Sequence, residues 1–248
     1  MWTSAAALTA EPSTDPTFSA DDLHALRALG REQRFLPGWT LSTASARKLL
    51  LIERGFVKVV EQRGGRETVL SVHGPGEHLG EIALVDRVDR AHTIVALTGG
   101  HAVHLPASSL WRLLDLRPEL NRTLIMALTA RLGSVAQQQA DDALTPAVAR
   151  IAGRVLWLAD RFGTERGAVT VIDIPLAQAD LASWAGMSRE SGVRALRQLR
   201  DAGWIRVEQR RIIVIDRAAL DRYAHDPGRG PAADPRAQRT QPAPLALI

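Results

Sequence analysis

Cysteine is absent from the 248-residue sequence, and its absence excludes several kinds of chemistry. The chain can have no disulfide framework, no thiol nucleophile, and neither a zinc site nor an iron–sulfur cluster held by cysteine. Long apolar runs are missing too, since none approaches the roughly 18 residues that a membrane-spanning helix needs. The sequence therefore argues against a redox sensor that works through sulfur and against a membrane partner.

Sequence motifs of common enzyme classes are also missing. We find no Walker motif, no nucleophile elbow, and no spacing typical of paired catalytic carboxylates or metal ligands. The N-terminal MWTSAAALTAEPSTDP lacks the basic start of a secretory signal peptide and carries Glu11 and Asp15. We therefore expect a cytoplasmic protein that is not an enzyme and holds no metal.

What is present is an ordinary globular composition with a basic balance. Hydrophobic residues make up 46% and charged residues 23%, which argues against a mainly disordered, collagenous or coiled-coil chain. The length suits two small domains. The net charge is +4, and the basic residues are nearly all arginine. This overall charge is only a weak indication of a nucleic-acid partner.

The N-terminal half changes its pattern along the chain. Residues 1–18, like residues 226–248 at the other end, are rich in small residues and proline without a period, so we expect two disordered tails. Residues 21–30 predict a short helix that ends at a glycine. From 35 to 105, glycine and proline pairs separate short β-favouring runs, which predicts an antiparallel roll or barrel.

A leucine stripe follows Pro118 and predicts a long helix over residues 119–142. Such a stripe can be buried in the protein's own core or against a second copy of the helix, and the periodicity does not choose between them. A second helix is predicted from Pro146 to Phe162, ending at a glycine. The residues of the stripe that we assign to a candidate dimer interface are Leu120, Leu124, Leu128, Leu132 and Val135.

Residues 173–223 have the pattern of a winged helix-turn-helix. The segments LAQADLASWAG and SRESGVRALRQLRDAG predict two short helices, and WIRVEQRRIIVID predicts a hairpin that turns around residues 208–210. Ser188 is the expected N-cap of the second helix, and Gly203 its stop. The residues expected to pack between the two helices are Leu181, Ala182, Val193, Leu196 and Leu199.

Arginines are concentrated in this second helix and the hairpin. Residues 189–211 contain seven arginines and three acids, a local charge of 7 − 3 = +4. Arg189, Glu190 and Arg194 share the first half of the helix, where arginine can bind guanine and glutamate can accept from cytosine in the major groove. The alternative is a solvated charged face with pairs such as Glu190 with Arg194.

Four more residues are DNA-binding candidates outside this base-reading trio. Ser188 and the first amides of the helix can hold a phosphate, and Arg210 and Arg211 of the hairpin are expected to contact phosphates as well. Gln178, in the first helix, completes the set.

A second motif lies in GPGEHLGEIALVDRVDRAHTIVAL, residues 74–97. Gly80, Glu81 and Ile82 can present backbone amides where a helical turn begins, and Arg90 follows nine residues after Glu81. Amides and an arginine together can bind a phosphate, while the carboxylate can accept from a ribose hydroxyl. The alternative is a surface turn with an ion pair between Glu81 and Arg90.

Taken together, these segments resemble the Crp/Fnr superfamily of transcription regulators, over roughly residues 20–218. GMSRESGVRALRQLRDAGWI is similar to the family's recognition helix, and GEHLGEIAL with Arg90 is similar to its phosphate-binding cassette. The resemblance implies an α+β fold with a cyclic-nucleotide-binding β-roll at 19–117. A dimerisation helix at 118–142 and a winged helix-turn-helix at 143–225 are expected to follow.

The same resemblance implies roles for the residues. Base reading falls on Arg189, Glu190 and Arg194, ribose recognition on Glu81, and phosphate recognition on Arg90. The leucine stripe becomes the dimer interface, and the implied partners are double-stranded DNA, a second copy and RNA polymerase. The alternative is a cyclic-nucleotide-binding module without DNA activity, against which the arginine helix argues.

Two departures from the family pattern concern the effector. Ala91 stands where cyclic-AMP-responsive members have Ser or Thr, and Val135 and Ala136 stand where they have the Thr-Ser pair that touches adenine. The effector is therefore expected to be a different nucleotide, a weakly bound one or none, and the missing hydroxyls argue against cyclic AMP. Haem is a further option in the family, with His73 or His78 as candidate ligands.

Overall fold

The computed structural model describes residues 18–43, 47–81, 92–208 and 210–227. Its first helix is α1 (Ala20–Leu29), in which Ser19 and Asp22 form a capping box and Gly30 is the C-cap. This confirms the short helix predicted from the sequence. The two predicted tails lie almost wholly outside the described residues.

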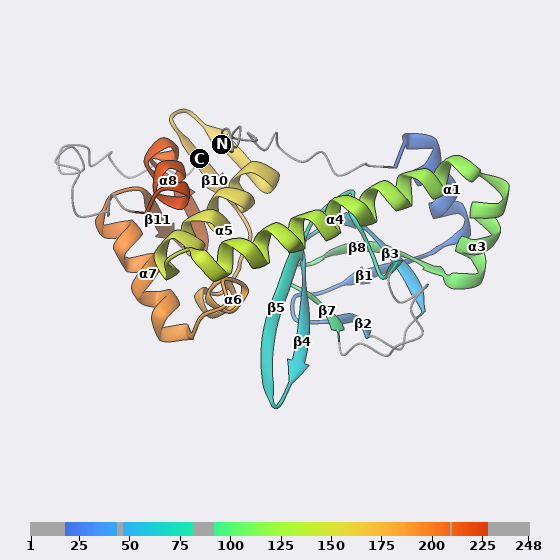
Figure 1. Ribbon diagram of the computed structural model, residues 1–248. Helices are drawn as coiled ribbons and strands as arrows, with labels where there is room; N and C mark the ends of the chain where they lie inside the picture. Colours follow the sequence, from blue (N-terminus) through green and yellow to red (C-terminus); the bar gives the residue numbers. More distant parts are fainter. Residues whose placement is uncertain (1–17, 44–46, 82–91, 209, 228–248) are drawn as a thin grey trace, which may run out of the picture.

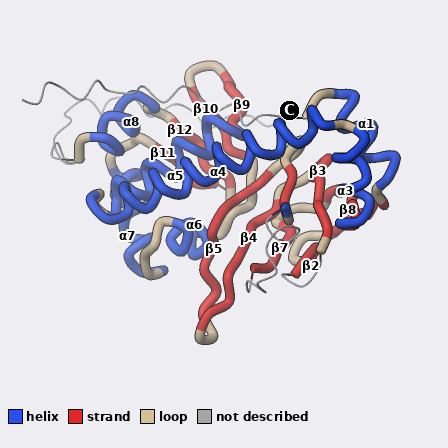
Figure 2. Tube along the Cα trace, turned by 45° about the vertical axis from the view of Figure 1, so that its right-hand side comes forward, coloured by secondary structure: helices blue, strands red, loops and turns tan. Residues whose placement is uncertain are grey.

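The N-terminal strands build two four-stranded antiparallel sheets (Figures 1 and 2). The first sheet has the order β1 (Arg31–Phe35), β8 (Gly100–Pro106), β3 (Lys48–Arg54) and β6 (His78–Leu79). The second has the order β2 (Thr40–Thr43), β7 (His92–Ala96), β4 (Val57–Arg63) and β5 (Arg66–His73). Side chains from both sheets, among them Leu50, Val57 and Ile94, form one buried cluster between them. The predicted β-roll is confirmed.

Helices cover the outer face of the first sheet. There, α3 (Ala107–Leu116) and the start of α4 (Pro118–Leu144) join α1 in a second buried cluster. Helix α4 runs the length of the molecule toward α5 (Ala147–Phe162), as Figure 1 shows. The predicted long helix and the helix after it are confirmed, although Pro146 is the N-cap of α5 rather than part of its first turn.

The leucine stripe of α4 is divided between two environments. Leu120 is 1% exposed and Leu124 8%, and both pack with α1 and α3 in the core of the protomer. Leu132, two turns further on, is 71% exposed. The first part of the stripe is therefore buried in the protomer's own core, and the later part presents an exposed apolar side chain.

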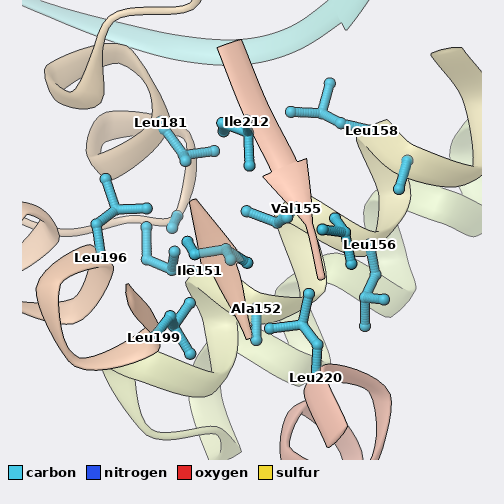
Figure 3. Close-up of a cluster of buried hydrophobic side chains, with 14 of the residues drawn as sticks. Ile151, Ala152, Val155, Leu156, Leu158, Leu181, Leu196, Leu199, Ile212 and Leu220 are labelled. Carbon is cyan, nitrogen blue, oxygen red and sulfur yellow. The ribbon is translucent and has the colours of Figure 1, made fainter. Parts of the chain in front are cut away.

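The C-terminal part combines helices with a third four-stranded sheet of order β11-β12-β10-β9. The two predicted helices are α6 (Gln178–Trp184) and α7 (Arg189–Asp201), and the predicted hairpin is β11 (Ile205–Glu208) with β12 (Arg211–Val214). The sequence did not predict β9 (Gly163–Arg166), β10 (Val169–Ile172) or α8 (Arg217–His225). Figure 3 shows leucines of α6 and α7 directed toward the residues of α5 that form this core.

The buried core of the C-terminal part also includes residues of the β-roll. Val60, Val69 and Val72, from the β4–β5 hairpin, belong to the same buried cluster as the residues of α5, α6 and α7. The hairpin lies beside α6 in both Figure 1 and Figure 2. The β-roll, which is the effector part of the chain, is therefore packed directly against the helix-turn-helix.

Candidate nucleic-acid interface and effector site

The orientation of α7 is fixed by its contact with α6. Gly192 faces α6 so closely that a Cβ added there would overlap the Cβ of Ala182. Leu196 and Leu199 complete the buried side of α7. Because the buried side is set by these residues, the opposite side of the helix must face solvent.

The exposed side of α7 carries the three residues that the sequence assigns to base reading. Arg189, Glu190 and Arg194 are all exposed on the first half of the helix. In the described part of the chain no ion pair joins Glu190 to Arg194, whereas Arg197 pairs with Asp201 at 3.5 Å. The structure thus brings the three predicted side chains together on one open surface.

One residue of the predicted helix contact is placed wrongly by the sequence reasoning. The hydrophobic pattern predicts Val193 between α6 and α7, but its exposed fraction is 41%. The small residues Gly192 and Ala195 face the core instead. The hydrophobic pattern misleads at this position because glycine and alanine, which permit close helix packing, contribute little to an apolar count.

The two DNA-binding candidates at the helix starts are both accessible. Ser188 is the N-cap of α7, and its Oγ accepts from the backbone N–H of Ser191 at 3.2 Å. Gln178 is the first residue of α6 and is exposed. The N-cap prediction for Ser188 is confirmed, while phosphate contact by Ser188 and DNA contact by Gln178 stay predictions.

The two hairpin arginines differ in their surroundings. Arg211 is engaged within the protomer, since its Nε donates to Asp173 Oδ1 at 2.6 Å. Arg210 is exposed and has a φ of 69°, a left-handed conformation that normally favours glycine. The tip of the hairpin therefore holds an arginine in a strained backbone position.

The predicted phosphate–ribose site is only partly described. Gly80 has a φ of 91°, and a Cβ there would overlap the carbonyl oxygen of Lys48. Glu81 is 4% exposed, so its carboxylate is buried at the start of the cassette. Ile82, Arg90 and Ala91 lie outside the described residues, and their assigned roles stay predictions.

Two basic residues of the roll lie near this site and escaped the sequence reasoning. His104 is paired with Leu50 across β8 and β3, and is 8% exposed. Within the described residues neither of its ring nitrogens has a hydrogen-bond partner. Burial, with the charge of Lys48 adding to it, lowers the pKa of His104 to about 4. Burial also lowers the pKa of Lys48. The sequence does not indicate that Lys48 and His104 are neighbours, because only the register of β3 and β8 brings them together.

The candidate haem ligands do not fit that role. Both ring nitrogens of His73 are engaged, Nδ1 with Glu77 at 2.6 Å and Nε2 with Ser71 at 2.8 Å. His78 is buried, with its ring 4.8 Å from that of Phe18. Among the described residues no group of three His, Asp or Glu side chains could hold a metal ion.

Polar contacts tie the effector part to the helix-turn-helix. Lys58 Nζ on β4 donates to Asp180 Oδ1 on α6 at 2.8 Å and to Glu67 Oε1 at 2.7 Å. Burial alone would lower the pKa of Lys58, but the hydrogen bonds and charges of these two carboxylates raise it above its ordinary value. Ser183 Oγ accepts from the backbone N–H of Val69 at 3.1 Å.

A second group of contacts joins the roll to α5. Arg161 of α5 donates to Glu77, the carboxylate that also binds His73. Burial would raise the pKa of Glu77, but His73 and Arg161 together hold it below its ordinary value. The rings of Phe56 and Phe162 lie 5.3 Å apart across the same junction.

The surface of α4 that could meet a second copy is shorter than predicted. Leu120 and Leu124 are already buried in the protomer, which leaves them little surface for contact with a second copy. Leu128 is half-buried, and Leu132 and Val135 are exposed. The sequence reasoning missed Ile125 and Met126, which are exposed apolar residues on the same helix.

Comparison with known proteins gives matches for both halves of the chain. Residues 34–117 match the cyclic nucleotide-binding domain family, and residues 149–223 match the Crp-like helix-turn-helix domain family. The chain is 32% identical over 178 residues to the CRP-like cAMP-activated global transcriptional regulator of Mycobacterium tuberculosis. That match covers 71% of this chain and 80% of the relative.

Solved structures give the same architecture. A CRP-family transcriptional regulator of Thermus thermophilus is 28% identical, with a TM-score of 0.65, and the match covers 78% of this chain and 96% of that one. The c-di-GMP responsive global regulator CLP of Xanthomonas campestris has a TM-score of 0.66 at 21% identity, covering 79% and 99%, and so shows the fold alone. None of the helices in the described residues is both long and apolar enough to cross a membrane.

Proposed function

The chain belongs to the Crp/Fnr family of DNA-binding transcription regulators, and from this premise we propose that it reads a two-fold symmetric DNA site as a homodimer. The family consists of regulators rather than enzymes. A regulator of this kind acts on DNA in the cytoplasm, with RNA polymerase as the partner whose activity it changes.

The observation that carries the proposal is the exposed first half of α7. Packing against Ala182 fixes the rotation of this helix, and the fixed rotation leaves Arg189, Glu190 and Arg194 free. Arginine can donate two hydrogen bonds to guanine O6 and N7, and glutamate can accept one from cytosine N4. We therefore assign these three residues to base reading, and Ser188, Gln178, Arg210 and Arg211 to the phosphate backbone.

The proposed dimer surface is the exposed part of α4. Leu132 and Val135 continue the face on which Leu128 is half-buried, and Ile125 and Met126 extend the apolar surface. Apolar residues at helical spacing on a long helix are suited to pairing with a copy of the same helix. Such a dimer would present two copies of α7 to half-sites centred about one helical turn, roughly 10 bp, apart.

The proposed effector is a nucleotide held through its phosphate and ribose. Glu81 is buried where the cassette begins, which supports a carboxylate that accepts from a ribose hydroxyl, and Arg90 is assigned to the phosphate. The relative from Mycobacterium tuberculosis is named as cAMP-activated. Here Ala91, Val135 and Ala136 lack the hydroxyls expected of a cyclic AMP site, so we propose that cyclic AMP binds weakly.

The experiment that tests the proposal is selection of bound sequences from random duplex DNA, repeated with cyclic mono- and dinucleotides. The expected result is a symmetric sequence with G·C pairs in each half-site. Arg189→Ala or Arg194→Ala should cost about 1 to 3 kcal/mol of binding free energy and relax the preference at one G·C position. Equal weakening on all duplexes would remove these residues from base reading.

A further inference from the structure

We infer that Val193 is a further base-reading residue, whose side chain contacts the C5 methyl group of a thymine in the major groove. The inference rests on the proposed function, because it takes α7 as the helix that enters the groove. The hydrophobic pattern assigns Val193 to the core, whereas its exposed fraction is 41%.

Helix α7 cannot turn to bury this valine. Gly192, the preceding residue, lies against Ala182 with no room for a side chain. Consecutive residues of an α-helix are separated by about 100° around its axis, so a rotation that buried Val193 would bring its branched side chain to the place where not even a Cβ fits. The exposure of Val193 is therefore a fixed feature of the helix-turn-helix.

Val193 lies in the middle of a charged surface. Arg189 is four residues before it and Arg197 four residues after it, so all three share one face of α7, and Arg194 is next to it. The hydrophobic clusters of the described residues do not include Val193. An apolar side chain is thus presented to solvent among arginines.

One group in DNA matches an apolar side chain in this position. The C5 methyl of thymine is the apolar group that base edges present in the major groove, and the other features there are hydrogen-bond donors and acceptors. Residues near the start of a recognition helix contact base edges, and Val193 is the fifth residue of α7. Contact between its methyl groups and the thymine methyl would remove apolar surface of both from water.

The position of Val193 argues against a chance surface residue. Single exposed apolar residues are common in proteins, and most have no role. A valine, however, favours a helix less than alanine or arginine, so helix propensity gives no reason for a valine at this exposed position. Its place at the centre of the base-reading surface gives it a use only when DNA is bound.

The test compares DNA duplexes that differ by single methyl groups. Starting from the selected sequence, each thymine is replaced by deoxyuridine at the equivalent position of both half-sites. The dissociation constants of the unchanged protein and of Val193→Ala are then measured by fluorescence anisotropy. At one position, uracil should weaken binding of the unchanged protein about fourfold for each half-site, as expected for one buried methyl, and should leave Val193→Ala unaffected.

The matched control for Val193→Ala is a change at another exposed residue of α7. Gln198→Ala changes an exposed residue nearer the end of the same helix and should keep the full uracil effect. The inference is overturned if replacement of thymine by deoxyuridine weakens the unchanged protein and Val193→Ala equally at every position. It is also overturned if the selected half-sites contain no thymine. Either result would leave sequence-specific binding intact. Failure of the unchanged protein to select any DNA sequence would instead overturn the proposed function.

Discussion

Lys58 and Asp180 are 122 residues apart in the sequence, yet their Nζ and Oδ1 atoms lie 2.8 Å apart where β4 meets α6. Lys58 belongs to the β-roll and Asp180 to the helix-turn-helix, and their side chains are only 12% and 20% exposed. The pair therefore fixes the helix-turn-helix on the roll, while the side of α7 that we propose for base reading remains exposed. This geometry favours a DNA-binding part that is already held in position before DNA arrives.

Removal of the Lys58–Asp180 contact should weaken DNA binding. Lys58→Ala and Asp180→Asn should each lower operator affinity about tenfold, because a loosened helix-turn-helix loses more freedom when it binds. A double-mutant cycle in chemical denaturation should give a coupling free energy of about 1 to 2 kcal/mol. Glu67→Gln is the matched control, since Glu67 binds the same ammonium group but is 40% exposed. Tighter operator binding by the two variants would mean that the contact restrains α7 instead.

The backbone of Arg210 gives a prediction in which stability and DNA binding move in opposite directions. Arg210→Gly should raise the free energy of unfolding by about 1 kcal/mol, because glycine adopts a positive φ without strain. It should also reduce the slope of log affinity against log salt by about one for each protomer, through loss of a phosphate contact. Thermal denaturation and salt titrations of operator binding measure the two effects.

Arg210→Ala separates the charge from the strain. It should lose the same DNA affinity as Arg210→Gly without the gain in stability, because alanine keeps a side chain at the left-handed position. An Arg210→Gly variant with unchanged salt dependence would exclude a phosphate contact by this residue.

The sequence predicts regular elements well where local signals agree. Ser188 and Gly203 mark the ends of α7 through capping and a positive φ, both of which are local properties, and the structure confirms both ends. The missed hairpin β9–β10 has short strands that begin directly at the end of α5, so no turn residue separates helix from strand. Val193 shows the limit of hydrophobic counting, since side-chain size and not polarity decides which face of α7 is buried.

The candidate site was predictable to a similar degree. Residues clustered in sequence, such as Arg189, Glu190 and Arg194, could be assigned together because helix geometry alone places them on one face. Contacts such as Lys58 with Asp180 depend on how two domains pack, and periodicity carries no information about that. The burial of Leu124 follows from the position of α1 and α3, which the pattern of α4 alone does not contain.

The exposed end of the α4 stripe should control assembly. Leu132→Glu would place two like charges in a self-complementary interface, where unpaired burial costs several kcal/mol, so the variant should be monomeric and lose operator affinity while keeping its helix content. Leu124→Glu should instead unfold the protomer, because Leu124 is buried with α1 and α3. Analytical ultracentrifugation and circular dichroism distinguish the two. A Leu132→Glu variant that stays dimeric would place the dimer contact elsewhere.

His104 should make the folded protein sensitive to mild acid. Its pKa of about 4 in the folded protein lies below the ordinary value of 6.5, so between these values the unfolded chain binds a proton that the folded chain does not. The contribution of His104 to the free energy of unfolding should therefore be fully present above about pH 6.5. As the pH drops toward 4, the free energy of unfolding should fall by about 1 to 2 kcal/mol. His104→Leu should flatten this part of the curve in denaturant titrations.

The effector prediction turns on three missing hydroxyl groups. Each neutral hydrogen bond contributes about 0.5 to 1.5 kcal/mol, so the loss of three at Ala91, Val135 and Ala136 should weaken cyclic AMP binding by about one to three orders of magnitude. Restoring them in a triple variant, Ala91→Ser, Val135→Thr and Ala136→Ser, should recover that affinity in calorimetric titration, and Arg90→Ala should abolish it. The unchanged protein should bind its operator without added nucleotide, because its helix-turn-helix is already held against the roll. Micromolar cyclic AMP binding by the unchanged protein, together with no DNA binding in its absence, would contradict both parts of this prediction.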